Sequence, residues 1–190
     1  MPTALFLIAV GALTRIVPHP PNAVPMGALA LYAGARLPRR WAWTVPVAAM
    51  ALSDLVMDLF HFYAWTGFDP ARLVSYATFA AIAALGHLPR REAGSPTWTR
   101  MATWSGMSLL ASTLFFVTSN LASWRAPEIG YPATWAGLVA CFTLAIPFFP
   151  YTLLADLAGT TLLFFGLDPL RERLLRARKA SAEGLATDLD

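Results

Sequence analysis

Six apolar segments divide this chain, and they constrain its fold more than any other feature. They cover residues 3–17, 24–35, 41–60, 71–88, 101–124 and 134–167. A helix of about 20 apolar residues crosses the hydrocarbon core of a bilayer. Only 13% of the residues are charged, against about 25% in an ordinary soluble domain. We therefore predict an all-α integral membrane protein with six transmembrane helices over residues 1–167, which excludes a large soluble catalytic domain.

Two of these segments have unusual lengths. The second, residues 24–35, is too short to cross the hydrocarbon core as a straight helix, and the sixth is too long for one unbroken vertical helix. Pro147 and Pro150 lie inside the sixth segment, where each removes a backbone hydrogen-bond donor. We expect both segments to be irregular, and the prolines mark either a packing kink or backbone that faces a wet cavity.

The basic residues predict the orientation of the chain. Eleven of the fourteen Lys and Arg residues lie in three clusters, which follow the second, fourth and sixth segments. Six crossings place these clusters on one side, and the positive-inside rule assigns that side to the cytoplasm. Both termini are then cytoplasmic, and residues 18–23, 61–70 and 125–133 form external loops. Because the net charge of +3 arises from clusters of this kind, we predict no nucleic-acid partner.

The C-terminal region has a different composition. Residues 168–179 predict a short basic amphipathic helix that begins at Asp168 and Pro169. Such a helix binds anionic membrane lipids at the inner leaflet, and docking to a cytoplasmic protein is the alternative. Residues 180–190 are small, polar and acidic, so we predict a disordered tail.

Polar residues gather at one predicted depth, in the outer half of the bundle. An ionisable residue within a bilayer costs about 3 kcal/mol or more unless it is paired or hydrated, so Asp54 is expected to face the bundle interior. A substrate-binding site open to the exterior explains the set economically. Its members, counted from the predicted loops, are His19, Asn22, Asp54, Tyr76, Asn120, Trp124, Arg125 and Cys141.

Several of these residues have a structural alternative. Asp54 could cap a helix or pair with a hydroxyl group such as that of Ser75. Cys141, the only cysteine, is of a type that often packs as a small buried apolar side chain. Trp124 and Arg125 could belong to an interfacial girdle.

Catalytic motifs are absent from the sequence. It contains no His pair at metal-ligand spacing, no Gly-rich phosphate loop and no Ser nucleophile elbow. We therefore predict a protein that is not an enzyme and that has no intrinsic cofactor. The rival class is a membrane-embedded enzyme that acts on a lipid or cofactor through Cys141 or Asp54. Asp156 has no evident partner in the sequence and is expected to serve helix packing or coupling.

Four stretches resemble a known family. They are residues 15–28 (RIVPHPPNAVPMGA), 46–54 (PVAAMALSD), 115–120 (FFVTSN) with Trp124, and 137–149 (GLVACFTLAIPFF). This pattern is similar to that of the S components, the substrate-binding membrane subunits of energy-coupling factor vitamin transporters. The resemblance implies a six-helix bundle in a bacterial inner (plasma) membrane, with an external pocket beneath the loop that joins the first two helices. It adds Met26, at the end of that loop, to the substrate-binding set.

The resemblance also implies a ligand and partners. Within the family, the chain looks most like the solitary BtuM-type cobalamin carriers, so the predicted vitamin is a cobalamin. His19 and Cys141 could then offer the cobalt of the corrinoid an imidazole or a thiolate. Family members that dock on a shared energy-coupling module carry a small-residue repeat on the first helix. Ala4, Ala9 and Ala12 do not repeat at that spacing, so a carrier that works alone is as plausible as one with that partner.

Overall fold

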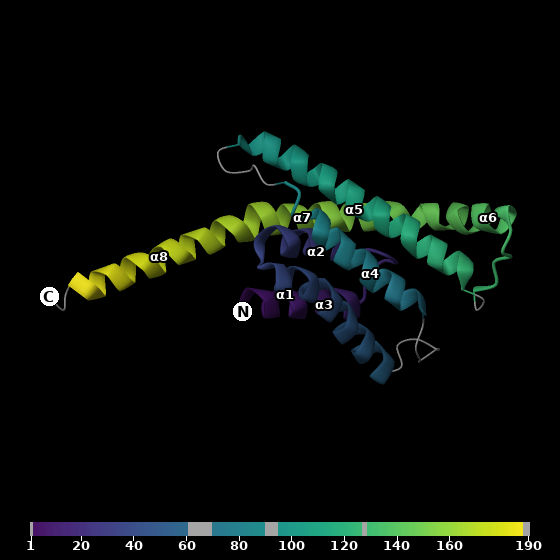
Figure 1. Cartoon of the computed structure of the whole chain (residues 1–190), viewed down its shortest axis with the longest axis horizontal. Coiled ribbons are helices and arrows are strands. Elements are labelled where there is room, and N and C mark those ends of the chain that lie inside the picture. Colours follow the sequence, from purple (N-terminus) through teal and green to yellow (C-terminus); the bar gives the residue numbers. More distant parts are fainter. Residues whose placement is uncertain (1, 61–69, 90–94, 127–128, 188–190) are drawn as a thin grey trace.

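The chain folds into a bundle of helices. A computed structural model describes residues 2–60, 70–89, 95–126 and 129–187, and within these ranges it contains no strand. The elements, shown in Figure 1, are α1 (Pro2–Ile16), α2 (Met26–Arg36), α3 (Arg39–Leu59), α4 (Pro70–Leu85), α5 (Thr97–Arg125), α6 (Trp135–Ala145), η2 (Ile146–Phe148), α7 (Phe149–Thr161), η3 (Leu162–Leu167) and α8 (Asp168–Thr187). The last five elements follow one another without a connecting loop, so the described residues form six helical rods. The all-α prediction is confirmed.

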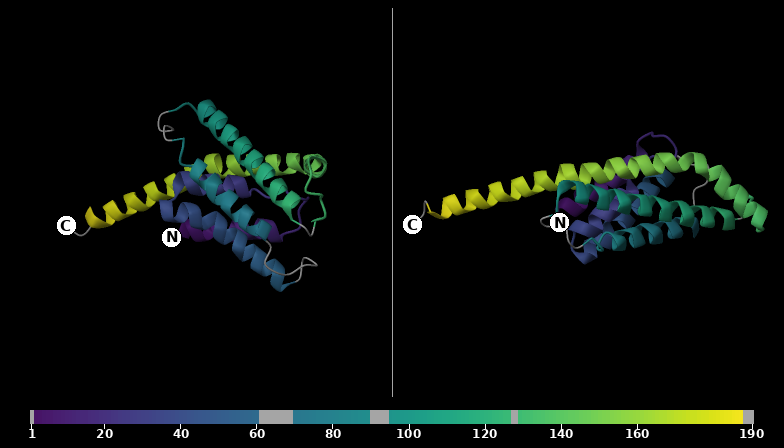
Figure 2. Two further views of the ribbon diagram at one scale, coloured as in Figure 1. Left: turned by 45° about the vertical axis from the view of Figure 1, so that its right-hand side comes forward. Right: turned by 90° about the horizontal axis from the view of Figure 1, so that it is seen from above.

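The bundle has two ends, to which we give fixed names. Helix α1 begins and α8 leaves the bundle at one end, which we call the terminal end (Figure 1). At the other, α3 and α5 end and α4 and α6 begin; this is the loop end. Helix α8 extends beyond the other helices in all views (Figures 1 and 2).

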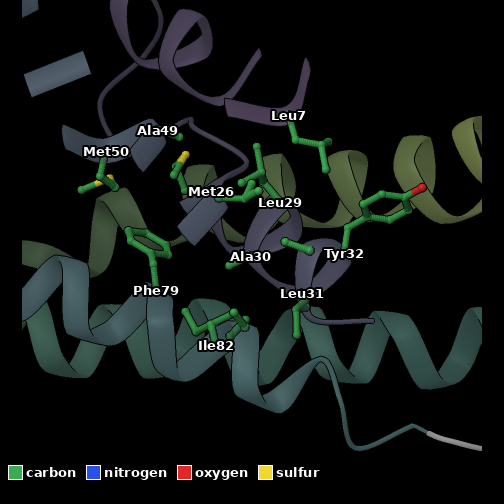
Figure 3. Close-up of a cluster of buried hydrophobic side chains, with 14 of the residues drawn as sticks. Leu7, Met26, Leu29, Ala30, Leu31, Tyr32, Ala49, Met50, Phe79 and Ile82 are labelled. Carbon is green, nitrogen blue, oxygen red and sulfur yellow. The ribbon is translucent and has the colours of Figure 1, made fainter. Parts of the chain in front are cut away.

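Helix α2 occupies the centre of the bundle. Residues 26–34 are all buried, and α2 packs against α3, α4, α5 and α7. Figure 3 shows Leu29, Ala30 and Leu31 of α2 among apolar side chains of the surrounding helices. With 11 residues, α2 is about 16 Å long at 1.5 Å per residue. It is therefore a half-length but regular α-helix, so the short length of the second segment is confirmed and its expected irregularity was wrong.

Glycine allows α2 and α4 to approach closely. A Cβ atom placed on Gly34 would collide with the carbonyl oxygen of Ala83 and would lie 3.1 Å from the Cα atom of Gly86. On Gly86, in turn, it would clash with the carbonyl oxygen of Leu31. These collisions are with backbone, which cannot move aside as a side-chain tip can. The two helices can therefore cross at this distance only with glycine at both positions.

The sixth apolar segment is a bent rod. A short 3-10 turn, η2, separates α6 from α7 at Pro147, and Pro150 lies in the first turn of α7. The rod changes direction there, as the right-hand view of Figure 2 shows. The predicted irregularity is confirmed, and its cause is the pair of missing backbone donors. A second irregularity, the π-helical segment η3, leads directly into α8.

The C-terminal region differs from its sequence prediction. Asp168 has helical backbone angles and follows a helical residue, so it continues the preceding helix rather than starting a new one. Helix α8 then runs to Thr187, past the predicted boundary at residue 179. The prediction of disorder rested on the small, polar and acidic composition of this segment. The alanine, leucine and glutamate residues within 180–186 also have high helix propensity, which favours the helix that is observed. Residues 188–190 lie outside the described residues.

Three helices of the described chain are long and apolar enough to cross a membrane. They are Arg39–Leu59, Thr97–Arg125 and the rod Trp135–Leu174. Pro2–Ile16 and Ala71–Leu85 are apolar but shorter. Many large apolar side chains on these helices, such as Leu55, Leu109 and Leu154, face outward. An outward apolar surface of this kind suits lipid rather than water.

Candidate functional site

A charged group lies between α1, α3 and α4, in the half of the bundle toward the loop end. An Nη1 atom of Arg15 is 2.7 Å from Oδ1 of Asp54, and the Tyr76 hydroxyl donates to Oδ2 of the same carboxylate at 2.6 Å. Arg15 also donates to the Met50 carbonyl at 3.0 Å and to the Ser53 hydroxyl. Asp54 is only 5% exposed. Partners from two other helices thus hold the carboxylate. We call Arg15, Asp54 and Tyr76 the Asp54 group.

The Asp54 group lies one helical turn beyond the start of α2. A Cβ atom on Gly11 would lie 3.0 Å from the Cβ of Ala49 and 3.6 Å from the sulfur of Met26, so these residues share one level. Arg15 follows Gly11 by four residues and Asp54 follows Ala49 by five, both toward the loop end. At 1.5 Å per residue the guanidinium and carboxylate therefore lie about 6–8 Å beyond Met26.

A second ion pair lies nearer the loop end than the Asp54 group. Arg72 of α4 forms a bidentate ion pair with Asp58 of α3, with nitrogen–oxygen distances of 2.6 and 2.7 Å. Asp58 follows Asp54 by one turn on the same face of α3. Both partners are partly exposed, so solvent and salt weaken their attraction.

Another polar group lies between α5 and α6. The Cys141 thiol is buried and donates to the Asn120 carbonyl oxygen at 3.4 Å, with the Asn120 side-chain oxygen at 3.9 Å. The indole N–H of Trp124 donates to the Pro132 carbonyl at 3.0 Å, and the Arg125 guanidinium lies 5.5 Å from the centre of the Trp124 ring. Asn120, Trp124 and Cys141 thus fasten the loop end of α5 to α6 and to the connection before it.

The remaining predicted site residues precede or begin α2. His19 is exposed and makes a contact from Nδ1 to the Pro20 carbonyl at 2.8 Å. Asn22 is exposed and has a positive φ of 62°, a conformation that asparagine tolerates better than most residues. Met26 is buried in the apolar core, as Figure 3 shows.

The structure therefore joins the predicted residues in two groups rather than one. Tyr76 and Asp54 meet on one side of α4, whereas Asn120 and Cys141 meet on α5 and α6. Helices α4 and α5 lie between the two groups. A hydrogen bond of 2.9 Å between the hydroxyl groups of Thr78 and Thr118 connects these two helices. The aspartate's hydroxyl partner is Tyr76, while Ser75 donates to the Ala71 carbonyl of its own helix.

Sequence reasoning missed the cation in the Asp54 group. Arg15 and Arg72 lie outside the three basic clusters. Each stands at a depth where α3 carries an aspartate, and each pairs with that aspartate. Opposite charges at equal depth in neighbouring apolar segments were the available signal, because an unpaired charge at that depth is costly.

Two more buried carboxylates lie nearer the terminal end. Asp156 of α7 is 1% exposed and accepts from the Ala28 backbone N–H at 3.0 Å and the Ser112 hydroxyl at 2.8 Å. Asp168 accepts from the Tyr32 hydroxyl at 2.7 Å and from Nε of Arg36 at 2.6 Å. The Arg36 pair is covered by the stacked rings of Trp104 and Phe164.

Asp156 stands at the start of α2, where helix geometry leaves backbone N–H groups without partners. Pro25, the residue before α2, provides no side-chain cap. The carboxylate of Asp156 fills that role from another helix, and its negative charge suits the positive end of the helix dipole. A Cβ atom on Gly27 would collide with this carboxylate, with its Cγ only 2.9 Å away. Glycine at position 27 is what allows the carboxylate to reach the helix end.

The described residues contain no group of three or more His, Cys, Asp or Glu side chains that could hold a metal ion. In comparisons with known proteins, no curated protein and no solved structure matches the chain. A family match does exist, and it covers residues 1–179. The chain therefore belongs to the family described as a family of unknown function (DUF6580).

Proposed function

We propose that this protein carries a vitamin across the bacterial inner membrane in the manner of an S component, and that the vitamin is a cobalamin. In this proposal the chain passes through the membrane six times, with residues 17–25 completing the crossing of the half-length helix α2, and the terminal end faces the cytoplasm while the loop end faces outward. The observation that carries the proposal is the buried Asp54 group. Charged side chains inside an apolar bundle are costly to place and mark substrate or ion pathways in membrane proteins.

The position of α2 supports a binding site at this level. Helix α2 fills the centre of the bundle from Met26 toward the terminal end, and the Asp54 group lies one turn beyond its start. Asn120 follows Ser112, which is level with the start of α2, by two turns toward the loop end. A ligand over the start of α2 would lie between the two polar groups, beneath residues 17–25.

The chemistry of the two groups suits a large polar ligand. A corrinoid carries amide and phosphate groups, to which Arg15, Tyr76 and Asn120 can offer hydrogen bonds. His19 and Cys141 remain the proposed donors to cobalt. Cys141 would have to release the Asn120 carbonyl to become a thiolate ligand, and bonding to the metal would compensate for that loss.

A binding measurement tests the proposal directly. The purified protein, reconstituted in lipid nanodiscs, is titrated with cobalamin, and bound vitamin is read from its visible absorption. We expect saturable binding with one vitamin per chain, which Asp54→Asn weakens at least tenfold. Thr44→Val, which removes an exposed hydroxyl on the same helix, is the matched control and should bind normally. Absence of binding by the folded wild-type protein would overturn the cobalamin assignment.

Uptake is the second test. A bacterial strain without its own cobalamin importer is grown with the vitamin as the limiting nutrient, with and without this protein. Rescue of growth supports transport, and rescue that requires an added energy-coupling module identifies that module as a partner. Failure of rescue despite normal membrane insertion contradicts the transport proposal.

The membrane-embedded enzyme is the less supported alternative. In the described structure the hydrogen-bond partners of the Cys141 sulfur are the two oxygens of Asn120, which accept the thiol hydrogen and cannot remove it as a base. Both carboxylate oxygens of Asp54 are already engaged, one by Arg15 and the other by Tyr76. An enzyme would show turnover of a product, whereas a carrier shows only stoichiometric binding.

A further inference from the structure

The interface between α5 and α7 contains a row of buried polar side chains that the proposed binding site does not use. Ser112 bonds to Asp156, and two turns nearer the terminal end Trp104 stacks on Phe164 with ring centres 3.8 Å apart. The helices run antiparallel, so the residues midway between these contacts, Ser108 and Thr160, face each other. We call Asp156, Ser112, Ser108 and Thr160 the α5–α7 polar row.

The two hydroxyl groups in the middle of this row have no partner. Ser108 and Thr160 are 0% and 2% exposed, and neither oxygen forms a hydrogen bond within the described structure. Other buried or partly buried helical hydroxyls here, such as Ser53 and Thr118, donate to their own backbone carbonyls. Buried hydroxyls without protein partners are normally satisfied by bound water. The row therefore predicts water between Ser108 and Thr160, one turn from the carboxylate.

Asp156 differs from the other buried carboxylates because its contacts include no cation. Asp54 pairs with Arg15 and Asp168 pairs with Arg36, whereas among the described residues Asp156 is bonded to the Ser112 hydroxyl and to the backbone at the start of α2. These donors stabilise the ionised form. Burial away from water opposes them and stabilises the neutral form. A carboxyl group under two opposed influences is suited to gain and lose a proton.

The charged and titratable groups on the elements packed against Asp156 lie far from it. Helix α2 carries Tyr32 and Arg36, both of which bond to Asp168. Helix α5 carries Arg100 and Arg125 near its two ends. Helix α7 carries Tyr151, which is exposed on the outer surface, and η2 and η3 carry none. Arg36 is eight residues from Ala28, about 12 Å along the helix.

We propose that Asp156 is a proton-binding site in the middle of the bundle and that the α5–α7 polar row holds the water through which the proton arrives. The proton joins Oδ2, which now accepts from Ser112, and the carboxylate becomes a neutral carboxylic acid. Ser112 can reverse its role and accept from this O–H, because a hydroxyl both donates and accepts. Oδ1 continues to accept from the Ala28 N–H, so the cap on α2 weakens without breaking.

This assignment adds regulation to the proposed function and rests on it for that part only. Asp156 caps the helix end over which the vitamin is proposed to bind. A neutral Asp156 holds that helix end less firmly, because a hydrogen bond to a charged acceptor is stronger than one to a neutral acceptor. Vitamin affinity should therefore change with pH in the wild-type protein and not in Asp156→Asn.

Infrared difference spectroscopy tests the proton site without any vitamin. The full-length protein in nanodiscs is titrated while the carbonyl stretch of protonated carboxylic acids is recorded. We expect a band that grows on acidification and is absent in Asp156→Asn. Ser112 donates to the ionised carboxylate more strongly than it accepts from the neutral acid. Ser112→Ala therefore destabilises the ionised form more, and the midpoint of the band should rise by about one pH unit. Ser105→Ala, an exposed serine on the same helix, should leave the midpoint unchanged.

The water is tested by isotope exchange of the same band. Transfer into heavy water shifts the band as the carboxyl proton is replaced by deuterium. Thr160→Val keeps the side-chain shape but removes the hydroxyl, and it should slow this exchange at least tenfold. Thr161→Val is the matched control, since Thr161 is exposed and bonds to its own helix. Equal exchange in both variants would overturn the role of the polar row.

The outcomes separate the two proposals. A protein that binds vitamin but lacks a titrating band removed by Asp156→Asn contradicts the proton site alone, and Asp156 is then a permanent helix cap. A protein with that band but without vitamin binding contradicts the proposed function alone. If Asp156→Asn does not fold, the midpoint shift in Ser112→Ala decides the question, because no shift would contradict the assignment.

Discussion

At the scale of single residues, three aspartates of the bundle are paired with arginines. Arg15 with Asp54, Arg72 with Asp58 and Arg36 with Asp168 are ion pairs between different helices. The sequence indicated that Asp54 faces the bundle interior, because an aspartate that faced lipid would carry a large free-energy cost. Its choice of partner could not be read in the same way, since it depends on which helices are neighbours and how each is rotated.

Removing one member of the buried pair should destabilise the protein strongly. We expect Arg15→Met to lower the free energy of unfolding by about 3 kcal/mol or more, because it leaves the Asp54 carboxylate buried without a cation. Adding Asp54→Leu to that variant should recover most of the loss. Unfolding of the wild-type protein, Arg15→Met, Asp54→Leu and the double variant in detergent, followed by circular dichroism, gives the coupling energy of the pair. A double variant as unstable as Arg15→Met would show that the pair is not the source of the effect.

Cys141 can be tested as a cobalt ligand by a substitution that changes one atom. In Cys141→Ser we expect weaker cobalamin binding and a changed visible spectrum of the complex, because a hydroxyl is a poorer ligand for cobalt than a thiolate. Cys141→Ala reports the loss of the side chain's volume alone. If all three proteins give the same spectrum, Cys141 is a packed core residue and His19 is the remaining candidate ligand.

At the scale of elements, segment lengths were the most informative property of the sequence. The short second segment became the half-length helix α2, and the long sixth segment became a rod bent at Pro147. The start of α8 was predicted at the proline after Asp168, but the helix passes through this residue. Proline fits the first turn of a new helix because its missing N–H has no partner there. It also fits after a π-helical turn, where the bond to the carbonyl four residues earlier is already displaced.

The close crossing of α2 and α4 provides a prediction about packing. Gly34→Ala should destabilise the protein by about 1–3 kcal/mol, because the new methyl group meets the backbone of Ala83 and the helices must separate. Gly106→Ala is the control, because a Cβ there meets nothing within 4 Å. That change should be neutral or stabilising by up to about 1 kcal/mol, since alanine favours a helix interior. Equal thermal stability of the two variants would contradict this account of the crossing.

At the scale of the whole molecule, the arrangement predicts a topology that labelling can check. In a Cys141→Ser background, single cysteines are introduced at Ala133, before α6, and at Ser181, in α8; both positions are exposed. A membrane-impermeant maleimide applied to intact cells should label Ala133→Cys and leave Ser181→Cys unlabelled until the cells are opened. Labelling of Ser181→Cys in intact cells would place the terminal end outside and contradict the six-crossing arrangement.

The rod formed by α7, η3 and α8 has a mechanical consequence. Residues 149–187 are helical throughout, a length of about 58 Å at 1.5 Å per residue. Asp168 and Asp156 both lie on this stretch of helix, and each is hydrogen-bonded to α2, Asp156 at its start and Asp168 near its end through Tyr32 and Arg36. A movement of this stretch relative to α2 would therefore have to break these bonds or carry both ends of the central helix with it.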